Sequence, residues 1–186
     1  MGVKGISVKG ISSATIKKLL RYWYIPLIVL LLIVLRNFAF LALMFFMAVS
    51  TLLVSAYRLV INADLGLELI SFYSIILSIA ASPTTGIAFA ATMLVLTAII
   101  QARLCSFLII KMVVYTLICI AAPMLAPLGI VQAGIILIIL KNVAFMVITY
   151  SINPARVLAD LPGNVVNIVL NIVLFSTLGR ALVLVL

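Results

Sequence analysis

The sequence predicts an all-α fold, a polytopic transmembrane helical bundle with six or seven spans. Of its 186 residues, 68% are hydrophobic and 8% are charged, whereas charged residues make up about a quarter of a soluble domain. The apolar residues form long runs separated by charged or turn-forming residues, and a helix needs about 20 apolar residues to cross a bilayer. A chain of this length holds at most about seven spans, so we expect one membrane domain and no separate soluble domain.

The residues before the first apolar run form a basic segment. They include five of the twelve lysines and arginines, namely Lys4, Lys9, Lys17, Lys18 and Arg21. Positive charge beside a span marks its cytoplasmic side and attracts anionic lipid headgroups. We prefer this explanation of the net charge of +9 to nucleic-acid binding. We therefore predict a cell-membrane protein with a cytoplasmic basic segment over 1–21 and a single transmembrane domain over 22–186.

The first apolar stretch, over 22–57, is interrupted only by Arg36 and Asn37. It is too long for one span and barely long enough for two. One interpretation is a tight hairpin of two short helices that turns at these two residues. The other is a slanted or interfacial first helix, followed by a single span over about 38–57.

The distribution of positive charge favours the hairpin. With two spans there and a cytoplasmic N-terminus, the chain has seven spans, its C-terminus lies outside, and four later cations fall at cytoplasmic ends. These four are Arg58, Arg103, Lys141 and Arg156. Without the extra span, the same four cations lie outside. We also expect Arg36, Lys141 and Arg180 to act as anchors at the membrane interface.

Five further spans follow, and the first four of them end at recognisable signals. The stretches "SPTTG" and "SINPARVLADLPGN" contain turn-forming residues, Arg103 interrupts another apolar run, and Pro123 and Pro127 end a fourth. The predicted spans cover 64–82, 86–102, 104–122, 128–150 and 164–186.

Small residues recur at a spacing of four near the start of two of these spans. Gly86 is followed by Ala90, and Gly129 is followed by Ala133. Such pairs let the backbones of two membrane helices approach closely, so we expect both glycines to lie at helix contacts.

One predicted span carries a polar face. Asp64 and Glu68 are two of only three acidic residues in the chain. On a helix that turns 100° per residue, they share an arc of about 120° with four serines. The serines are Ser71, Ser74, Ser78 and Ser82. Because such a face is costly against lipid, we expect it to face the bundle interior or a water-filled cavity.

Polar residues also recur inside two other predicted spans. Asn164, Asn167 and Asn171 follow one another at spacings of three and four, so their amides lie on one helix face. Lys111 lies within the span over 104–122 and needs either a route to the interface or a partner. Glu68 is the carboxylate that can reach membrane depth, so an ion pair between Lys111 and Glu68 is one option.

Two interpretations of these polar residues remain open. In the first, they are hydrogen-bonding contacts that hold helices together. In the second, they line a solute-binding cavity with Asp64 and Glu68 at its mouth. The candidate substrate-binding or cavity-lining residues are Asp64, Glu68, Ser71, Ser78, Lys111, Asn164, Asn167 and Asn171.

The composition argues against metal and catalytic chemistry. The chain has no histidine, and both of its cysteines, Cys105 and Cys119, lie in apolar runs, so the usual ligands of zinc, haem and iron–sulfur clusters are missing. Three acidic residues without a histidine offer little for acid–base catalysis. We therefore expect no metal, no cofactor and no enzymatic activity.

The order "DLGLELISFYSIILSIAASPTTGIAFAA" resembles the second and third helices of the substrate-binding S components of energy-coupling-factor vitamin transporters, with Pro83 and Gly86 of the intervening turn retained. The closing "NVVNIVLNIVLFSTLGRALVLVL" resembles the last helix of small S-component-like and MreD-like membrane proteins. The resemblance covers about 38–186 and implies about six helices. It also implies that Asp64 and Glu68 face the substrate at the external mouth, on the opposite side from the one that the charge distribution indicates.

The sequence therefore favours a small-solute-binding membrane subunit of a transporter. Because the chain has no nucleotide-binding motif, such a subunit would need an ATPase module and other membrane subunits as partners, besides the lipid bilayer and the solute. The alternative is a structural or assembly subunit of a membrane complex without transport activity. No nucleic-acid partner is expected.

Overall fold

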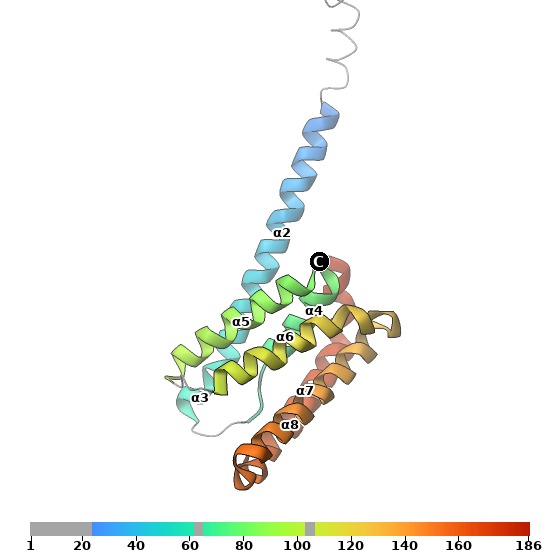
Figure 1. Cartoon of the computed structure of the whole chain (residues 1–186). Helices are drawn as coiled ribbons and strands as arrows, with labels where there is room; N and C mark the ends of the chain where they lie inside the picture. The colour runs from blue at the N-terminus through green and yellow to red at the C-terminus, as the bar shows by residue number, and fades with distance from the viewer. Residues whose placement is uncertain (1–23, 62–64, 103–106) are drawn as a thin grey trace, which may run out of the picture. The chain divides into compact units, whose positions relative to one another are not determined.

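A computed structural model of the chain describes residues 24–61, 65–102 and 107–186. The chain divides into two compact units, Met1–Leu43 and Met44–Leu186, and the helices of the second unit surround the site described below. All regular secondary structure in the described residues is helical, so the predicted all-α class is confirmed (Figure 1).

The first described helix, α2, is Tyr24–Ser55. It runs unbroken past Arg36 and Asn37, so the predicted hairpin at these residues is wrong. Neither residue is glycine or proline, and the apolar residues on both sides continue the helix. Its part Asn37–Ser55 is long and apolar enough to cross a membrane, close to the single span that the other interpretation placed over about 38–57.

The predicted span over 64–82 is only partly helical. After the short helix α3, Tyr57–Val60, the chain passes through the non-helical segment Leu65–Leu69 before α4, which is Ile70–Ala80. The 11 residues of α4 extend about 16 Å at 1.5 Å per residue, well short of a hydrocarbon core of roughly 30 Å. Asp64 lies outside the described residues, and Glu68 precedes the helix instead of lying on its polar face.

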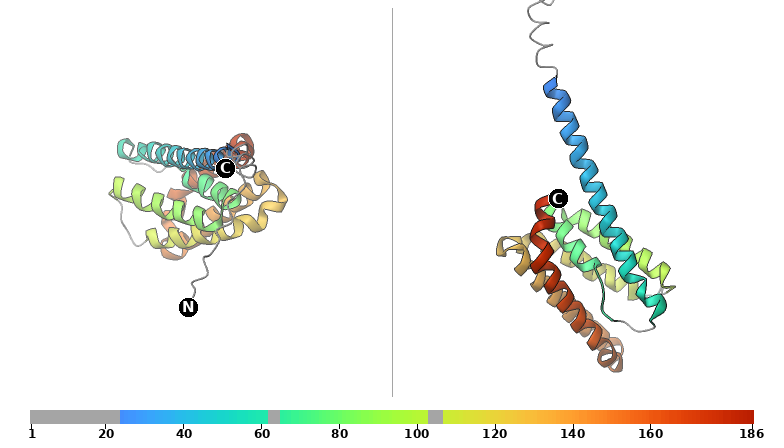
Figure 2. Two further views of the ribbon diagram at one scale, coloured as in Figure 1. Left: turned by 90° about the horizontal axis from the view of Figure 1, so that it is seen from above. Right: turned by 180° about the vertical axis from the view of Figure 1, so that it is seen from behind.

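Helix α4 is enclosed by the rest of its unit. All of its residues from Ile70 to Ser78 are buried, and it contacts α5, α6, α7, α8 and α9 (Figure 2). The serines of the predicted polar face, Ser71, Ser74 and Ser78, are buried in the bundle as expected. The apolar residues of α4 are buried as well, because other helices pack around it.

The helices that enclose α4 are long. They are α5, Pro83–Ile100, α6, Phe107–Leu125, and α7, Ile130–Ile152. Helix α5 begins earlier than expected because the Ser82 side chain accepts a hydrogen bond from the Thr85 N–H at 3.2 Å and Pro83 fits the first turn. A short 3-10 turn, η1 (Ala126–Leu128), joins α6 to α7.

The last part of the chain forms a continuous helical path. Helix α8 is Pro154–Leu174, the π-helical turn η2 is Phe175–Gly179, and α9 is Arg180–Val185. The stretch that was expected to be a loop before 164 is therefore mostly helical. Pro154 begins α8 at a position where a missing N–H costs nothing, and the helix continues through Pro162.

Glycines mark two close contacts. A Cβ atom added to Gly86 would lie 1.9 Å from Ser78 Oγ, so the predicted close approach at Gly86 is confirmed and joins α5 to α4. Gly129 instead has open space around it and a φ of +98°, so the prediction of packing there is wrong. The contact in that region is made by Gly134, where a Cβ atom would lie 2.4 Å from the Phe175 ring.

Among the described residues, five helical segments are long and apolar enough to cross a membrane. They are Asn37–Ser55, Pro83–Ile100, Phe107–Leu128, Ile130–Ile152 and Val157–Val185. Large apolar side chains such as Ile109, Leu117 and Val147 are exposed on their outer faces, as expected for helices in lipid. The architecture is thus compatible with a multi-pass membrane protein, and the count of six or seven spans stays a prediction.

Candidate functional site

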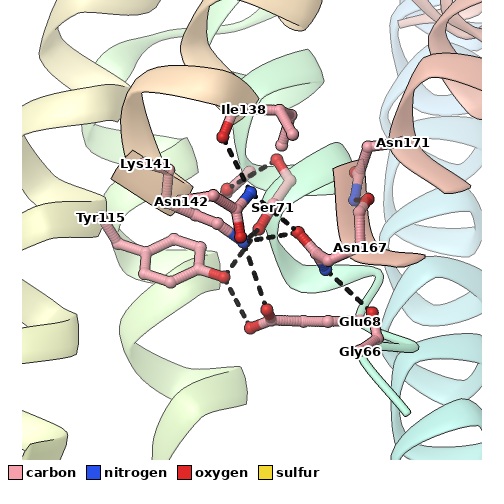
Figure 3. Close-up of polar contacts among 10 residues, drawn as sticks. Gly66, Glu68, Ser71, Tyr115, Ile138, Lys141, Asn142, Asn167 and Asn171 are labelled. Atoms are coloured by element: carbon pink, nitrogen blue, oxygen red, sulfur yellow. Dashed lines mark hydrogen bonds and ion pairs between the residues drawn. The ribbon is translucent and has the colours of Figure 1, made fainter. Parts of the chain in front are cut away.

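A cluster of polar side chains lies inside the unit Met44–Leu186, between helices that are otherwise apolar (Figure 3). It is assembled from five elements. The segment before α4 contributes Gly66 and Glu68, α4 contributes Ser71, α6 contributes Tyr115, α7 contributes Lys141 and Asn142, and α8 contributes Asn167.

Lys141 is the centre of this polar cluster. This residue lies midway along α7 and is 1% exposed. Its Nζ donates hydrogen bonds to Ser71 Oγ at 2.6 Å, to Asn167 Oδ1 at 3.0 Å and to Glu68 Oε2 at 3.3 Å. An ammonium group has three hydrogens to donate, so each of them has an acceptor.

The prediction that Lys141 is an anchor at the membrane interface is therefore wrong. The prediction that it lies at the cytoplasmic end of a span, with Arg58, Arg103 and Arg156, is wrong for the same reason. The spacing of small and apolar residues before Lys141 indicates that the lysine faces the inside of the bundle. Lys141 follows Ala133, Gly134, Leu137 and Ile138 at intervals of three and four, and all of them are buried on one face of α7. The lysine thus belongs to the inward face of its helix.

Glu68 is the anionic partner of Lys141. Its carboxylate forms an ion pair with the Lys141 ammonium at 3.3 Å, and its side chain is 21% exposed. The Tyr115 hydroxyl donates a hydrogen bond to Glu68 Oε1 at 2.6 Å and lies 2.7 Å from Ser71 Oγ. The expected partner, Lys111, is not the residue that pairs with this carboxylate.

Asn167 connects the polar cluster to the non-helical backbone before α4. Its Oδ1 accepts hydrogen bonds from Lys141 and, at 3.2 Å, from Asn142 Nδ2, while its Nδ2 donates to the Gly66 carbonyl at 3.0 Å. Gly66 has a φ of +71°, and a Cβ atom there would lie 1.8 Å from the Gly163 carbonyl oxygen. Irregular backbone among membrane helices is tolerated where protein partners satisfy it or where it lines a cavity.

A cavity of about 220 Å³ lies next to the polar cluster. Four charged side chains line it, namely Glu68, Lys111, Lys141 and Asp160. Its amide side chains are Gln101, Asn142, Asn164 and Asn167, and its apolar walls include Leu94, Phe107 and Phe145. The cavity therefore combines charge, hydrogen-bonding groups and apolar surface, the usual mixture of a small-molecule site.

The structure brings together five of the eight candidate residues. Glu68, Lys111, Asn164 and Asn167 line the cavity, and Ser71 belongs to the polar cluster. The remaining three are placed elsewhere or are outside the described residues.

Ser78 donates to the Ser74 carbonyl at 2.7 Å and packs beside Gly86, so it belongs to the contact between α4 and α5. Asn171 is buried and donates from Nδ2 to the Asn167 carbonyl at 2.8 Å. Asp64 lies outside the described residues. A binding role for any of the eight residues stays a prediction.

Several residues of the site were not assigned to it from the sequence. The charged ones are Lys141 and Asp160, and Tyr115 donates a hydrogen bond to the charged Glu68. Tyr115 follows Lys111 by one turn of α6, so the helical spacing would have placed it on the same face. Asp160 lies one turn before Asn164 on α8, inside a stretch that was expected to be a loop.

The groups in the cavity can hold a small polar molecule by ionic and hydrogen-bonding contacts. No group of three or more histidine, cysteine, aspartate or glutamate side chains that could hold a metal ion occurs in the part of the chain that the structure describes. The free thiol of Cys119 is buried and does not line the cavity.

Comparisons of the chain with protein-family models, with curated proteins and with solved structures found no match. The resemblance to S components and MreD-like proteins therefore stays a prediction. The function of the site is argued below from its own geometry.

Proposed function

We propose that this chain is an integral membrane protein that binds a small polar solute in the cavity beside the Glu68–Lys141 ion pair, as a membrane subunit of a transporter. The observation that carries the proposal is the cavity of about 220 Å³ with four charged side chains in its lining. Charged residues among membrane helices are costly, and where they face a cavity they mark solute or ion pathways. An apolar bundle held together by packing alone would need none of them.

The backbone around the cavity supports the same proposal. The non-helical segment Leu65–Leu69 leads into the short, buried helix α4, and Gly66 and Glu68 of this segment line the cavity. Solute sites in membrane transporters are commonly built where helices are discontinuous, because the freed backbone and side-chain groups face the solute. The non-helical segment Leu65–Leu69 likewise exposes groups of Gly66 and Glu68 to the cavity.

The proposed subunit works with partners. Its sequence contains no phosphate-binding loop, so an ATPase module and a further membrane subunit would supply the energy and the coupling for uptake. We propose the cell membrane as its location, with the basic N-terminal segment on the cytoplasmic side.

The test is ligand-dependent stabilisation of the purified, full-length protein in lipid nanodiscs. A panel of small metabolites is screened by thermal unfolding, and at least one should raise the melting temperature. A solute present at 100 times its Kd adds about 2.7 kcal/mol to the free energy of unfolding. The substitution Asn164→Leu replaces an amide of the cavity lining with a bulkier apolar side chain and leaves the Lys141 hydrogen bonds in place, so it should weaken or abolish the shift.

A matched control is Val165→Leu, at an exposed neighbouring position of α8, which should leave the shift intact. If no solute stabilises the protein and it purifies only in a stable complex with other membrane proteins, the assembly-subunit alternative is the better account.

A further inference from the structure

Lys111 differs from the other charged residues of the cavity. It is half-buried in α6, inside the membrane-compatible segment Phe107–Leu128, and it lines the cavity. Its Nζ lies 5.9 Å from the centre of the Phe107 ring. Within the described part of the chain its ammonium has no hydrogen bond or ion pair, which leaves its charge available to a ligand.

The other charges in the lining are already engaged. Glu68 and Lys141 form an ion pair with each other, so together they add no net charge. Asp160 has an interaction of its own within the chain. Among the described charged residues that line the cavity, Lys111 can therefore bind an anion without breaking a hydrogen bond or ion pair.

We propose that the solute is a small organic anion whose carboxylate is bound by Lys111 with the help of the Asn164 amide. This inference rests on the proposed solute-binding function. Transfer of a carboxylate from water into a partly buried site is unfavourable unless it gains a cationic partner and hydrogen bonds. Lys111 supplies the cation, and the Asn164 amide, which has no hydrogen bond within the described residues, supplies a donor.

The dimensions and walls of the cavity limit the rest of the ligand. An engineered apolar cavity of about 150 Å³ in another protein accommodates benzene, so about 220 Å³ suits a single ring or a short chain that carries one carboxylate. Phe107 and Phe145 provide an apolar wall for that part of the molecule.

The charge preference can be measured without knowing the natural ligand. In a background with Cys105→Ser and Cys119→Ser, Asn164→Cys places a thiol in the cavity lining. The thiol is reacted with anionic sulfonatoethyl and cationic trimethylammonium-ethyl methanethiosulfonate, with each rate divided by that of free cysteine. We expect Lys111→Gln to lower the ratio of the anionic to the cationic rate by roughly fivefold to tenfold, the effect of removing one nearby charge.

Two controls accompany this measurement. Arg180→Gln removes a cation of α9 that does not line this cavity and should leave the ratio unchanged. Leu94→Cys, at a lining position on α5, repeats the measurement in case the Asn164 variant does not fold. Benzoate should also slow labelling of the Leu94→Cys variant, in which Lys111 and Asn164 are both intact, at a concentration at least fivefold lower than its neutral isostere benzamide.

The outcomes separate the two proposals. If Lys111→Gln leaves the rate ratio unchanged, or if benzamide protects as well as benzoate, the anion inference is overturned while solute binding stands. Such a result would mean that the Lys111 ammonium extends to the membrane interface instead. If neither reagent labels a cysteine at either position, solutes do not reach the cavity, and the proposed function is overturned together with the inference.

Discussion

Lys141 Nζ and Glu68 Oε2 lie 3.3 Å apart, and this ion pair joins the middle of α7 to the non-helical segment before α4. The two residues are 73 positions apart in the sequence. Since neither charge is fully exposed, each depends on the other for compensation. The pair therefore fixes one wall of the cavity and holds the irregular segment against the bundle.

Neutralising one member of this pair should be far more damaging than neutralising both. Glu68→Gln leaves Lys141 charged and buried, so we expect it to lower the free energy of unfolding by about 3 kcal/mol. In the double variant Glu68→Gln with Lys141→Met no charge remains uncompensated, and most of that loss should be recovered. The measurement is a double-mutant cycle by denaturant unfolding in detergent. Additive effects of the two substitutions would show that the pair is not coupled.

A side chain at Gly66 should disrupt the segment before α4. Gly66→Ala introduces a Cβ that would lie 1.8 Å from the Gly163 carbonyl oxygen, at a φ of +71°. We expect a loss of more than about 2 kcal/mol, since the left-handed conformation alone costs about 1–2 kcal/mol for a residue with a Cβ.

Gly129→Ala is the matched control for Gly66→Ala. Its φ is +98° and its ψ is 144°, a backbone conformation close to one that only glycine adopts readily. Because nothing lies within 4 Å of the added Cβ, this variant reports backbone strain without a clash. A larger loss of melting temperature for Gly66→Ala than for Gly129→Ala would therefore indicate the contact with Gly163. Equal losses in the two variants would argue against that contact.

The packing of α7 against the π-helical turn η2 should respond to one methyl group. Gly134→Ala places a Cβ 2.4 Å from the Phe175 ring, and the three nearest atoms all belong to that ring. Overpacking of this kind costs about 1–3 kcal/mol. Because a side chain alone causes the conflict, Phe175→Leu in the same chain should restore part of the stability in thermal unfolding. If Phe175→Leu makes Gly134→Ala worse, the two residues are not in direct conflict.

The membrane character and most of the helices could be predicted from the sequence because they depend on local composition. The runs now seen as α5, α6 and α7 were placed within a few residues of their ends, and the differences arise at caps such as Ser82 and Pro83. A capping serine begins the helix at a proline that composition alone assigns to a turn.

The site could be predicted only in part because its key features depend on distant residues. The helix break before Ile70 requires Gly66 to meet Gly163, almost a hundred positions later, and no local pattern contains that contact. Lys141 was assigned to the interface because a single lysine in an apolar run usually extends toward water. Its hydrogen-bond partners come from three other segments, and in the sequence only the spacing of the small and apolar residues on α7 indicates that it faces inward.

Two asparagines one turn apart on α8 should respond oppositely to the same substitution. Asn167→Leu removes contacts to Lys141, Asn142 and Gly66, so buried donors lose their acceptor and we expect a loss of about 2–3 kcal/mol. Asn171 is also fully buried, but its Oδ1 has no hydrogen-bond partner in the described structure. Asn171→Leu removes that unsatisfied group and should change stability by less than about 1 kcal/mol or increase it. Thermal unfolding of the two variants in the same detergent compares them directly, and an equal loss in both would mean that Asn171 Oδ1 has a partner of its own.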